Sequence, residues 1–230
     1  MIEFTEQEVH KYSQGPIAGT GFLAFRDVQK LLSELSLQPG KALDLGCGNV
    51  RSIATIKDLC SSIHRCEFDG SAIEKFQTQY PDIPVFANNT SAEHFPSQPY
   101  DSIFSFLRFF HFDSLASMRS ELARCYHSLK PGGFLFIVHG NHSLSTANYA
   151  SVGGVTPPPS VEGDKFKVKL KLVDLVVEDT YWTVETIQSE CEKLGFQMQK
   201  IHQPLGEQAD NQPYLDEYSV APYTYLVLCK

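Results

Sequence analysis

The segment Leu43-Asp44-Leu45-Gly46-Cys47-Gly48-Asn49-Val50 is the most informative part of this 230-residue sequence. The apolar run at 42–45 predicts a short buried strand, and a helical pattern of apolar residues begins soon after the second glycine. Glycines at the end of a strand let the backbone approach a ligand closely, and they direct the amide groups of the next helix toward it. We therefore expect a strand, a glycine turn and a helix beside a bound ligand.

Strand and helix patterns alternate on both sides of this segment. Residues 22–37 carry apolar side chains at three- and four-residue steps, which is typical of a helix that buries one face. Alternating strands and helices favour a mostly parallel sheet with helices on both faces. The expected strands lie at 42–45, 63–68, 85–87, 102–106, 134–139, 196–201 and 224–228, and the later helices begin near 70, 115 and 183.

Composition excludes several classes of protein. With 42% hydrophobic and 20% charged residues the chain is an ordinary globular one, and its net charge of −8 argues against nucleic acid as a partner. No apolar run approaches the roughly 20 residues that a membrane helix needs. The acidic start of the chain is unlike a leader peptide, so we expect a cytoplasmic protein. The six cysteines form no C-x-x-C pair, which indicates reduced thiols and no metal site.

The alternation changes after residue 139. Residues 151–160 are rich in glycine and proline, and lysines then alternate with apolar residues over 165–172. The lysines form either a basic stripe for phosphates or the solvent-facing side of an edge strand, and we favour the edge strand. We expect one domain over 1–230, with an N-terminal helical cap at 1–38 and a lid-like insertion at 140–182.

Two acids flank the expected ligand. Asp44 stands two positions before the first glycine, where a carboxylate can orient a ligand that carries an ammonium group. Glu67 follows about 20 residues later, at the end of the second expected strand, where an acid can accept hydrogen bonds from ribose hydroxyls. Asp69 could also bind ribose, but its place before Gly70 suits a helix cap. Nicotinamide enzymes carry a third glycine where this chain has Arg51, which weakens that interpretation.

These residues resemble the class I S-adenosylmethionine-dependent methyltransferases that act on small molecules. The resemblance covers residues 40–139 well and the C-terminal third loosely. It implies a three-layer, Rossmann-like α/β fold with a seven-stranded, mostly parallel sheet in the order 3-2-1-4-5-7-6, the last strand antiparallel, and helices on both faces. The matching segments are Asp44-x-Gly46-x-Gly48, Glu67, Ser91-Ala92-Glu93-His94-Phe95-Pro96, Tyr100-Asp101-Ser102-Ile103, His111-Phe112-Asp113, Leu129-Lys130-Pro131-Gly132-Gly133 and Gly195-Phe196.

The resemblance also implies a cofactor, a reaction and a set of site residues. The cofactor is S-adenosyl-L-methionine, and the reaction transfers its methyl group by in-line displacement to an oxygen, nitrogen or carbon of a small-molecule acceptor. The enzyme would be a monomer or homodimer that binds neither nucleic acid nor membrane. The expected cofactor-binding residues are Tyr12, Asp44, Gly46, Cys47, Gly48, Glu67, Phe68, Ser91, Ala92 and Phe106.

Two departures from the family pattern keep other functions open. Val50 stands where the family usually has a third glycine, and Ser91 stands where an acid commonly accepts from the adenine amino group. Both changes could weaken the cofactor site. One alternative is therefore a catalytically weak or inactive methyltransferase-fold protein that acts by binding or regulation. Another is a nicotinamide oxidoreductase, which shares the strand, the glycine turn, the helix and the ribose acid.

His111 is the candidate catalytic residue. It follows the fourth expected strand, at the edge where an open α/β sheet presents its crevice, and histidine suits a general base near neutral pH. It could equally pack against the cofactor without exchanging a proton. Further candidates, each with a purely structural alternative, are Arg108, His139, His142 and the pair Tyr181-Trp182.

Overall fold

The structure is a computed structural model that describes residues 15–46, 51–67, 70–87 and 99–230. Its main sheet contains the strands β1 (Lys41–Leu45), β2 (Ser62–Glu67), β3 (Val85–Ala87), β4 (Tyr100–Phe106), β5 (Leu129–Gly140), β9 (Gln197–His202) and β10 (Tyr223–Cys229). Within the described residues these strands follow the order β3-β2-β1-β4-β5-β10-β9. β10 runs antiparallel to both of its neighbours, β5 and β9, and the other pairings between described strands of this sheet are parallel. The predicted fold class and strand order are confirmed.

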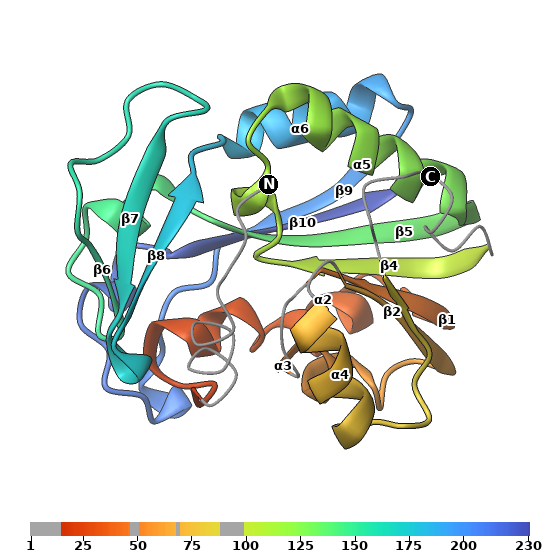
Figure 1. Cartoon of the computed structure of the whole chain (residues 1–230), viewed down its shortest axis with the longest axis horizontal. Helices are drawn as coiled ribbons and strands as arrows, with labels where there is room; N and C mark the ends of the chain where they lie inside the picture. Colours follow the sequence, from red (N-terminus) through yellow and green to blue (C-terminus); the bar gives the residue numbers. More distant parts are fainter. Residues whose placement is uncertain (1–14, 47–50, 68–69, 88–98) are drawn as a thin grey trace.

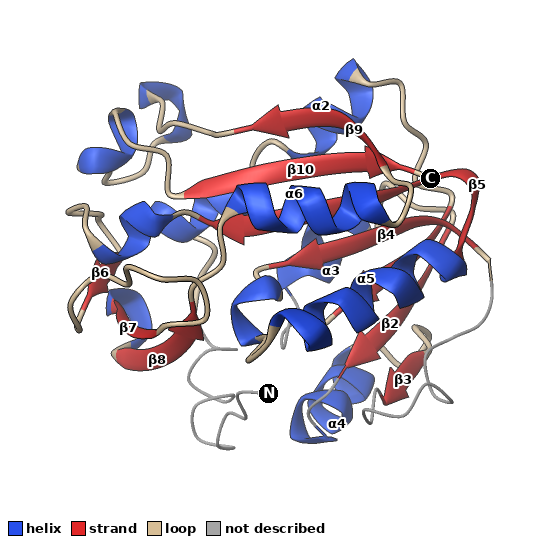
Figure 2. Cartoon of the chain, turned by 90° about the horizontal axis from the view of Figure 1, so that it is seen from above, coloured by secondary structure: helices blue, strands red, loops and turns tan. Residues whose placement is uncertain are grey.

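Helices cover both faces of this sheet. They are α2 (Val28–Glu34), α3 (Arg51–Ile56), α4 (Gly70–Gln79), α5 (Leu115–Ser128) and α6 (Val184–Lys193). In Figure 1, α5 and α6 lie above the sheet, whereas α2, α3 and α4 lie below it. Figure 2 shows α5 and α6 side by side over the strands. Among the described residues, no helix has the length and apolar character needed to cross a membrane.

The middle of the sheet is apolar on both faces. Along β5, Phe136 and Val138 pack into the cluster on the α2 and α3 side, while Leu135 and Ile137 pack into the cluster on the α5 and α6 side. Because successive side chains of a strand point to opposite faces, a strand covered on both sides needs an unbroken apolar run. This explains why residues 134–138 are continuously apolar.

The N-terminal helix is shorter than the sequence pattern predicts. Instead of one helix over 22–37, the structure has a 3-10 helix, η1 (Gly19–Ala24), followed by α2. Arg26 and Asp27 lie between the two, and both side chains are used in contacts with the far end of the chain. These tertiary contacts override the helical periodicity of the segment.

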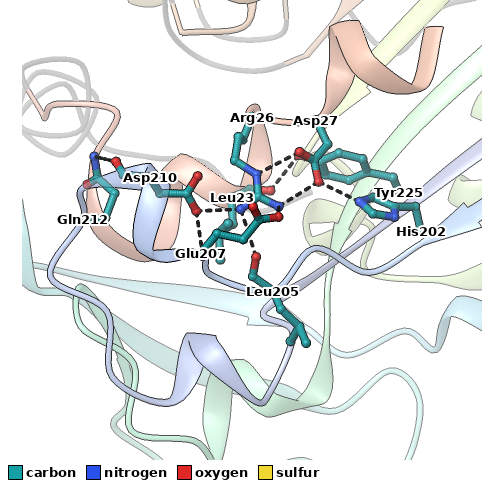
Figure 3. A network of polar contacts seen from close by, with 9 residues as sticks. All are labelled: Leu23, Arg26, Asp27, His202, Leu205, Glu207, Asp210, Gln212 and Tyr225. Carbon is teal, nitrogen blue, oxygen red and sulfur yellow. Dashed lines mark hydrogen bonds and ion pairs between the residues drawn. The ribbon is translucent and has the colours of Figure 1, made fainter. Parts of the chain in front are cut away.

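Figure 3 shows the polar network that connects the junction between η1 and α2 to the C-terminal part of the chain. The Arg26 guanidinium donates to both carboxylate oxygens of Asp27, at 2.8 and 2.9 Å, and to Asp210 Oδ2 at 2.6 Å. The Nε2 atom of His202 lies 2.7 Å from Asp27 Oδ2. Paired carboxylates of this kind are stabilised in their charged form, and the pKa of Asp27 is held below its usual range although burial opposes this.

A second, smaller sheet stands beside the main one. It consists of β6 (Val152–Gly154), β7 (Lys165–Leu170) and β8 (Leu175–Thr180), all antiparallel. The lysines of β7 are exposed while Phe166 and Val168 are buried, so the predicted solvent-facing side is confirmed. The prediction of an edge strand is wrong, because β7 is the central strand of this sheet. Its lysines face acids such as Glu178 rather than solvent alone, which removes the need for an edge position.

Candidate functional site

The described part of the site begins at the carboxyl end of β1. Gly46 follows this strand with a φ of 62°, a left-handed conformation that glycine adopts without steric cost. Its amide donates to the carbonyl of Cys66 at 2.8 Å, which joins the turn to β2. The chain thus turns sharply away from the sheet at the position where the sequence predicts a ligand.

Asp44 lies within β1 and is fully buried. The Ser52 hydroxyl donates to its Oδ2 atom at 2.7 Å, which connects β1 to α3 across the glycine turn. The side chain therefore holds the start of α3 against the strand, so that the two ends of the turn are fixed relative to each other.

Glu67 closes β2 and is 4% exposed. Arg65 lies two residues earlier on the same face of the strand and donates from Nη2 to Glu67 Oε2 at 3.1 Å. In the parallel register of β1 and β2, Arg65 also stands beside Asp44, and its Nη1 lies 3.7 Å from Asp44 Oδ2. One buried guanidinium therefore pairs with both acids that the sequence assigns to the cofactor.

Sequence reasoning missed Arg65, although a signal for it exists. Arginine is almost never fully buried without a partner, and this one stands in an otherwise buried parallel strand, 1% exposed. The ring of Phe76, from α4, lies 4.3 Å from the guanidinium carbon and covers it. An arginine two positions before the expected ribose acid predicts an ion pair on the same face of the strand.

Many of the predicted cofactor residues lie outside the described residues. These are Tyr12, Cys47, Gly48, Phe68, Ser91 and Ala92, and Val50 is also among them. Phe106 is described, at the end of β4, and its ring stacks on Phe25 at 5.1 Å between centroids. At 2% exposed, it is part of the core on the α2 side.

The chain leaves β4 through a strained turn. Leu107 has a φ of 56°, which is rare for a residue with a branched side chain, and its amide donates to the carbonyl of Val138 at 2.8 Å. Backbone strain of this kind costs on the order of 1–3 kcal/mol and clusters at functional sites. Arg108 then turns inward, 3% exposed, with Nε 3.5 Å from Glu121 Oε1. Arg108 could hold an acidic acceptor or merely face solvent on sequence grounds, and its burial rules out the solvent-facing alternative.

His111 ends the short 3-10 helix η3 (Phe109–His111), just beyond β4. Burial is the main cause that lowers the pKa of His111, to about 3, and the positive charges of Arg108 and Lys165 act in the same direction. The imidazole is therefore neutral at physiological pH. A histidine with so low a pKa is a weak base, which counts against the role of proton acceptor that the sequence suggested.

His139 and His142 differ in their surroundings. His139, at the end of β5, is 1% exposed, and its Nε2 donates to the carbonyl of Trp182 at 2.9 Å. Burial lowers its pKa to about 4. His142 begins the short 3-10 helix η4 (His142–Ser145), with Nε2 3.0 Å from the carbonyl of Pro159. Trp182 is a core residue whose indole nitrogen donates to the carbonyl of Phe112 at 2.9 Å, so it forms no exposed substrate wall.

A cavity of about 70 Å³ lies where the N-terminal segment, the turn after β4 and the small sheet meet. Its lining is mostly apolar, with Arg51 as the charged member. The lining residues are Pro16, Ala18, Gly21, Phe25, Arg51, Leu107, Ser151, Val152, Leu170, Leu172, Val173 and Tyr223. No group of residues able to hold a metal ion occurs in the described part of the chain.

Comparison with known families agrees with this geometry. Residues 43–137 match the model of a methyltransferase domain. Over these residues the chain is similar to a methyltransferase domain. The matched region runs from β1 into β5 and includes Asp44, Gly46 and Glu67. At the level of sequence, no curated protein matches the chain.

Solved structures of methyltransferases share the fold of this chain. CalS10, an amino pentose methyltransferase from Micromonospora echinaspora, has a TM-score of 0.65 and 14% identity, and the match covers 100% of this chain and 99% of that one. The N-methyltransferase NodS from Bradyrhizobium japonicum has a TM-score of 0.58 and 14% identity, over 98% and 95% of the two chains. A methyltransferase from Mesorhizobium loti has a TM-score of 0.62 and 16% identity, over 87% and 96%. At these identities the likeness establishes the fold.

The described residues of this region fit the cofactor that the resemblance implies, S-adenosyl-L-methionine. Glu67 stands at the carboxyl end of β2, where a carboxylate can bind ribose hydroxyls. Gly46 provides a turn that lets the backbone approach a ligand. Asp44 and Ser52 hold that turn in place. The chemistry of this set suits an adenosyl group with an amino-acid tail.

Proposed function

We propose that the protein binds S-adenosylmethionine between the glycine turn and Glu67 and transfers its methyl group to a small-molecule acceptor. The observation that carries the proposal is the pair of buried acids, Asp44 and Glu67, which Arg65 fixes at the carboxyl ends of two adjacent parallel strands. Open α/β sheets bind their ligands at this edge.

The protein's own contribution to such a reaction is mainly positioning. S-adenosylmethionine supplies a methyl group on a positively charged sulfur, which needs little further activation. Holding donor and acceptor in line and in contact can supply about 7–11 kcal/mol of the barrier reduction. In this proposal, Glu67 and the turn at Gly46 hold the cofactor. His111, as a neutral imidazole, faces the acceptor and orients it rather than taking its proton.

The proposed acceptor is small and partly apolar. The cavity beside Leu107 has an apolar lining, and pockets for small molecules are predominantly of this kind. The net charge of −8 disfavours nucleic acid as the substrate. We also propose that the enzyme works in the cytoplasm as a monomer or homodimer.

We further propose a single domain in which residues 1–38 form a cap and residues 140–182 form a lid-like insertion over the acceptor. Glu217 supports this arrangement, because its buried carboxylate accepts from Thr20 Oγ1 at 2.6 Å and from the amides of Ala150 and Leu215, both at 2.8 Å. The cap, the insertion and the C-terminal segment are thus joined at one point.

Calorimetry with S-adenosylmethionine and S-adenosylhomocysteine tests the proposal. We expect the wild type to bind both, and Gly46→Val to lose binding, since valine is strained at a positive φ. Gly132→Val is the matched control. Gly132 has a φ of 76° with no atom within 4 Å of an added Cβ, so this variant carries similar strain away from the site and should bind normally.

Three results would count against the proposal. If the wild type binds neither S-adenosylmethionine nor S-adenosylhomocysteine at millimolar concentration, the proposed cofactor site is wrong. Normal binding by Gly46→Val would show that the cofactor lies elsewhere. The protein could also bind S-adenosylmethionine but form no S-adenosylhomocysteine from it with any of a panel of small amines and phenols. That result would favour a non-catalytic binding protein.

A further inference from the structure

Asp179, on β8, is a buried acid that differs from the others in the described part of the chain. It is 6% exposed, yet none of the described residues donates a hydrogen bond to it or forms an ion pair with it. Burial of a carboxylate without a partner is costly, and such a group in a native structure calls for an explanation. The other buried acids all have polar partners; they are Asp27, Asp44, Glu67, Glu121, Glu190 and Glu217.

The surroundings of Asp179 are apolar and include aromatic rings of η3 and β5. In the β7 and β8 register it stands opposite Phe166, whose ring centroid is 6.3 Å from that of Phe110 in η3. The Phe110 ring in turn lies 4.7 Å from that of His139. The strand β8 packs against η3, which follows the carboxyl end of β4. Asp179 therefore belongs to the part of the small sheet that faces the ligand-binding edge of the main sheet.

Nearby charges leave Asp179 poorly neutralised. Burial raises its pKa to about 7, Glu178 adds to this, and Lys165 opposes it. The ammonium group of Lys165 donates to Thr180 Oγ1 at 2.5 Å rather than to the carboxylate. The titratable group of η3 itself is His111, which is neutral near pH 7.

We propose that Asp179 binds the methyl acceptor by accepting a hydrogen bond from its N–H or O–H group. The acceptors would then be amines or neutral hydroxyl compounds with an apolar body, and anionic compounds would be excluded, because a buried carboxylate repels them. The aromatic rings of Phe166 and Phe110 provide the apolar contact. Among the described residues no strand pairing joins the small sheet to the main one, so moving β8 relative to η3 breaks no strand ladder. This inference rests on the proposed function.

Binding of matched probes to the protein saturated with S-adenosylhomocysteine tests the inference. The probes are phenethylamine, which is cationic, and phenylacetate, an anion of similar size. We expect the wild type to bind the amine at least about tenfold more tightly than the acid, a difference of about 1.4 kcal/mol. Asp179→Asn should bring this ratio close to one while leaving the affinity for S-adenosylhomocysteine unchanged.

The control is Glu178→Gln, which changes the neighbouring residue on the exposed face of β8, and it should keep the wild-type ratio. Thermal unfolding provides a second readout that needs no acceptor. Wild-type Tm should fall, relative to that of Asp179→Asn, as the pH rises from about 4 to 7. If S-adenosylhomocysteine fails to bind, the proposed function is wrong. If it binds but neither probe does, or if Asp179→Asn keeps the preference for the amine, the role of Asp179 is wrong.

Discussion

Arg65 is the residue on which both acids of the site depend. Its guanidinium is 1% exposed and pairs with Asp44 and Glu67, so that two buried carboxylates share one positive charge. Removing one partner of a buried ion pair is strongly destabilising, because the remaining charge has lost its compensation. The position of Glu67 toward a ligand follows from this pairing.

We therefore expect Arg65→Met to lower the free energy of unfolding by about 3 kcal/mol. The same variant should weaken S-adenosylhomocysteine binding by about tenfold or more. Denaturant unfolding and calorimetry measure the two effects. Lys169→Met is the control, because both partners of its ion pair with Asp174 are exposed, and it should leave both quantities near wild type. A stable Arg65→Met protein with normal affinity would mean that the ion pairs do not position Glu67.

The buried histidines make the free energy of unfolding depend on pH. The pKa of His139 is lowered to about 4 by burial, so between pH 6.5 and 4 the unfolded chain takes up a proton that the folded chain does not. The free energy of unfolding should fall by up to about 3 kcal/mol over this range from His139 alone. Denaturant unfolding at several pH values should show a smaller loss in His139→Gln, whereas the exposed His127→Gln keeps the wild-type loss. Equal losses in all three proteins would contradict the assignment.

At the scale of elements, Glu217 joins three segments that are distant in sequence. Its carboxylate accepts from the side chain of Thr20 and from the amides of Ala150 and Leu215, which belong to the N-terminal cap, the insertion and the C-terminal segment. Because Glu217 is 0% exposed, its removal leaves buried donors without an acceptor.

Glu217→Ala should therefore cost about 3 kcal/mol of unfolding free energy. It should also speed amide hydrogen exchange in the small sheet more than in β4 and β5, because the sheet loses its link to the cap. Hydrogen exchange measured by mass spectrometry distinguishes the two regions. Glu34→Ala, at an exposed position near the end of α2, is the control and should leave exchange unchanged. If Glu217→Ala speeds exchange equally in the small sheet and in β4 and β5, the proposed role of Glu217 in joining the three segments is wrong.

At the scale of the whole molecule, the main sheet could be predicted because short sequence patterns indicate its strands and helices. The continuous apolar run of β5, the glycine turn at Gly46 and the cap of α5 by Ser114 are each encoded within a few residues. The interrupted N-terminal helix was missed, since Asp27 and His202 meet only in the folded chain.

The candidate site was predictable only in part. Asp44 and Glu67 stand out in sequence, but the guanidinium that fixes them depends on the register of β1 and β2. Asp179 could not be found, because alternation along β8 says which face it takes but not that its neighbours lack a donor. The pKa of His111 also depends on burial by distant segments, so its suitability as a base could not be judged from spacing.

A crystal structure with S-adenosylhomocysteine tests the central claim most directly. We expect the ribose hydroxyls to donate to the carboxylate of Glu67, still paired with Arg65, and the amino-acid portion to lie at the turn that begins at Gly46. A ligand bound elsewhere, with Glu67 making no contact to it, would contradict the account.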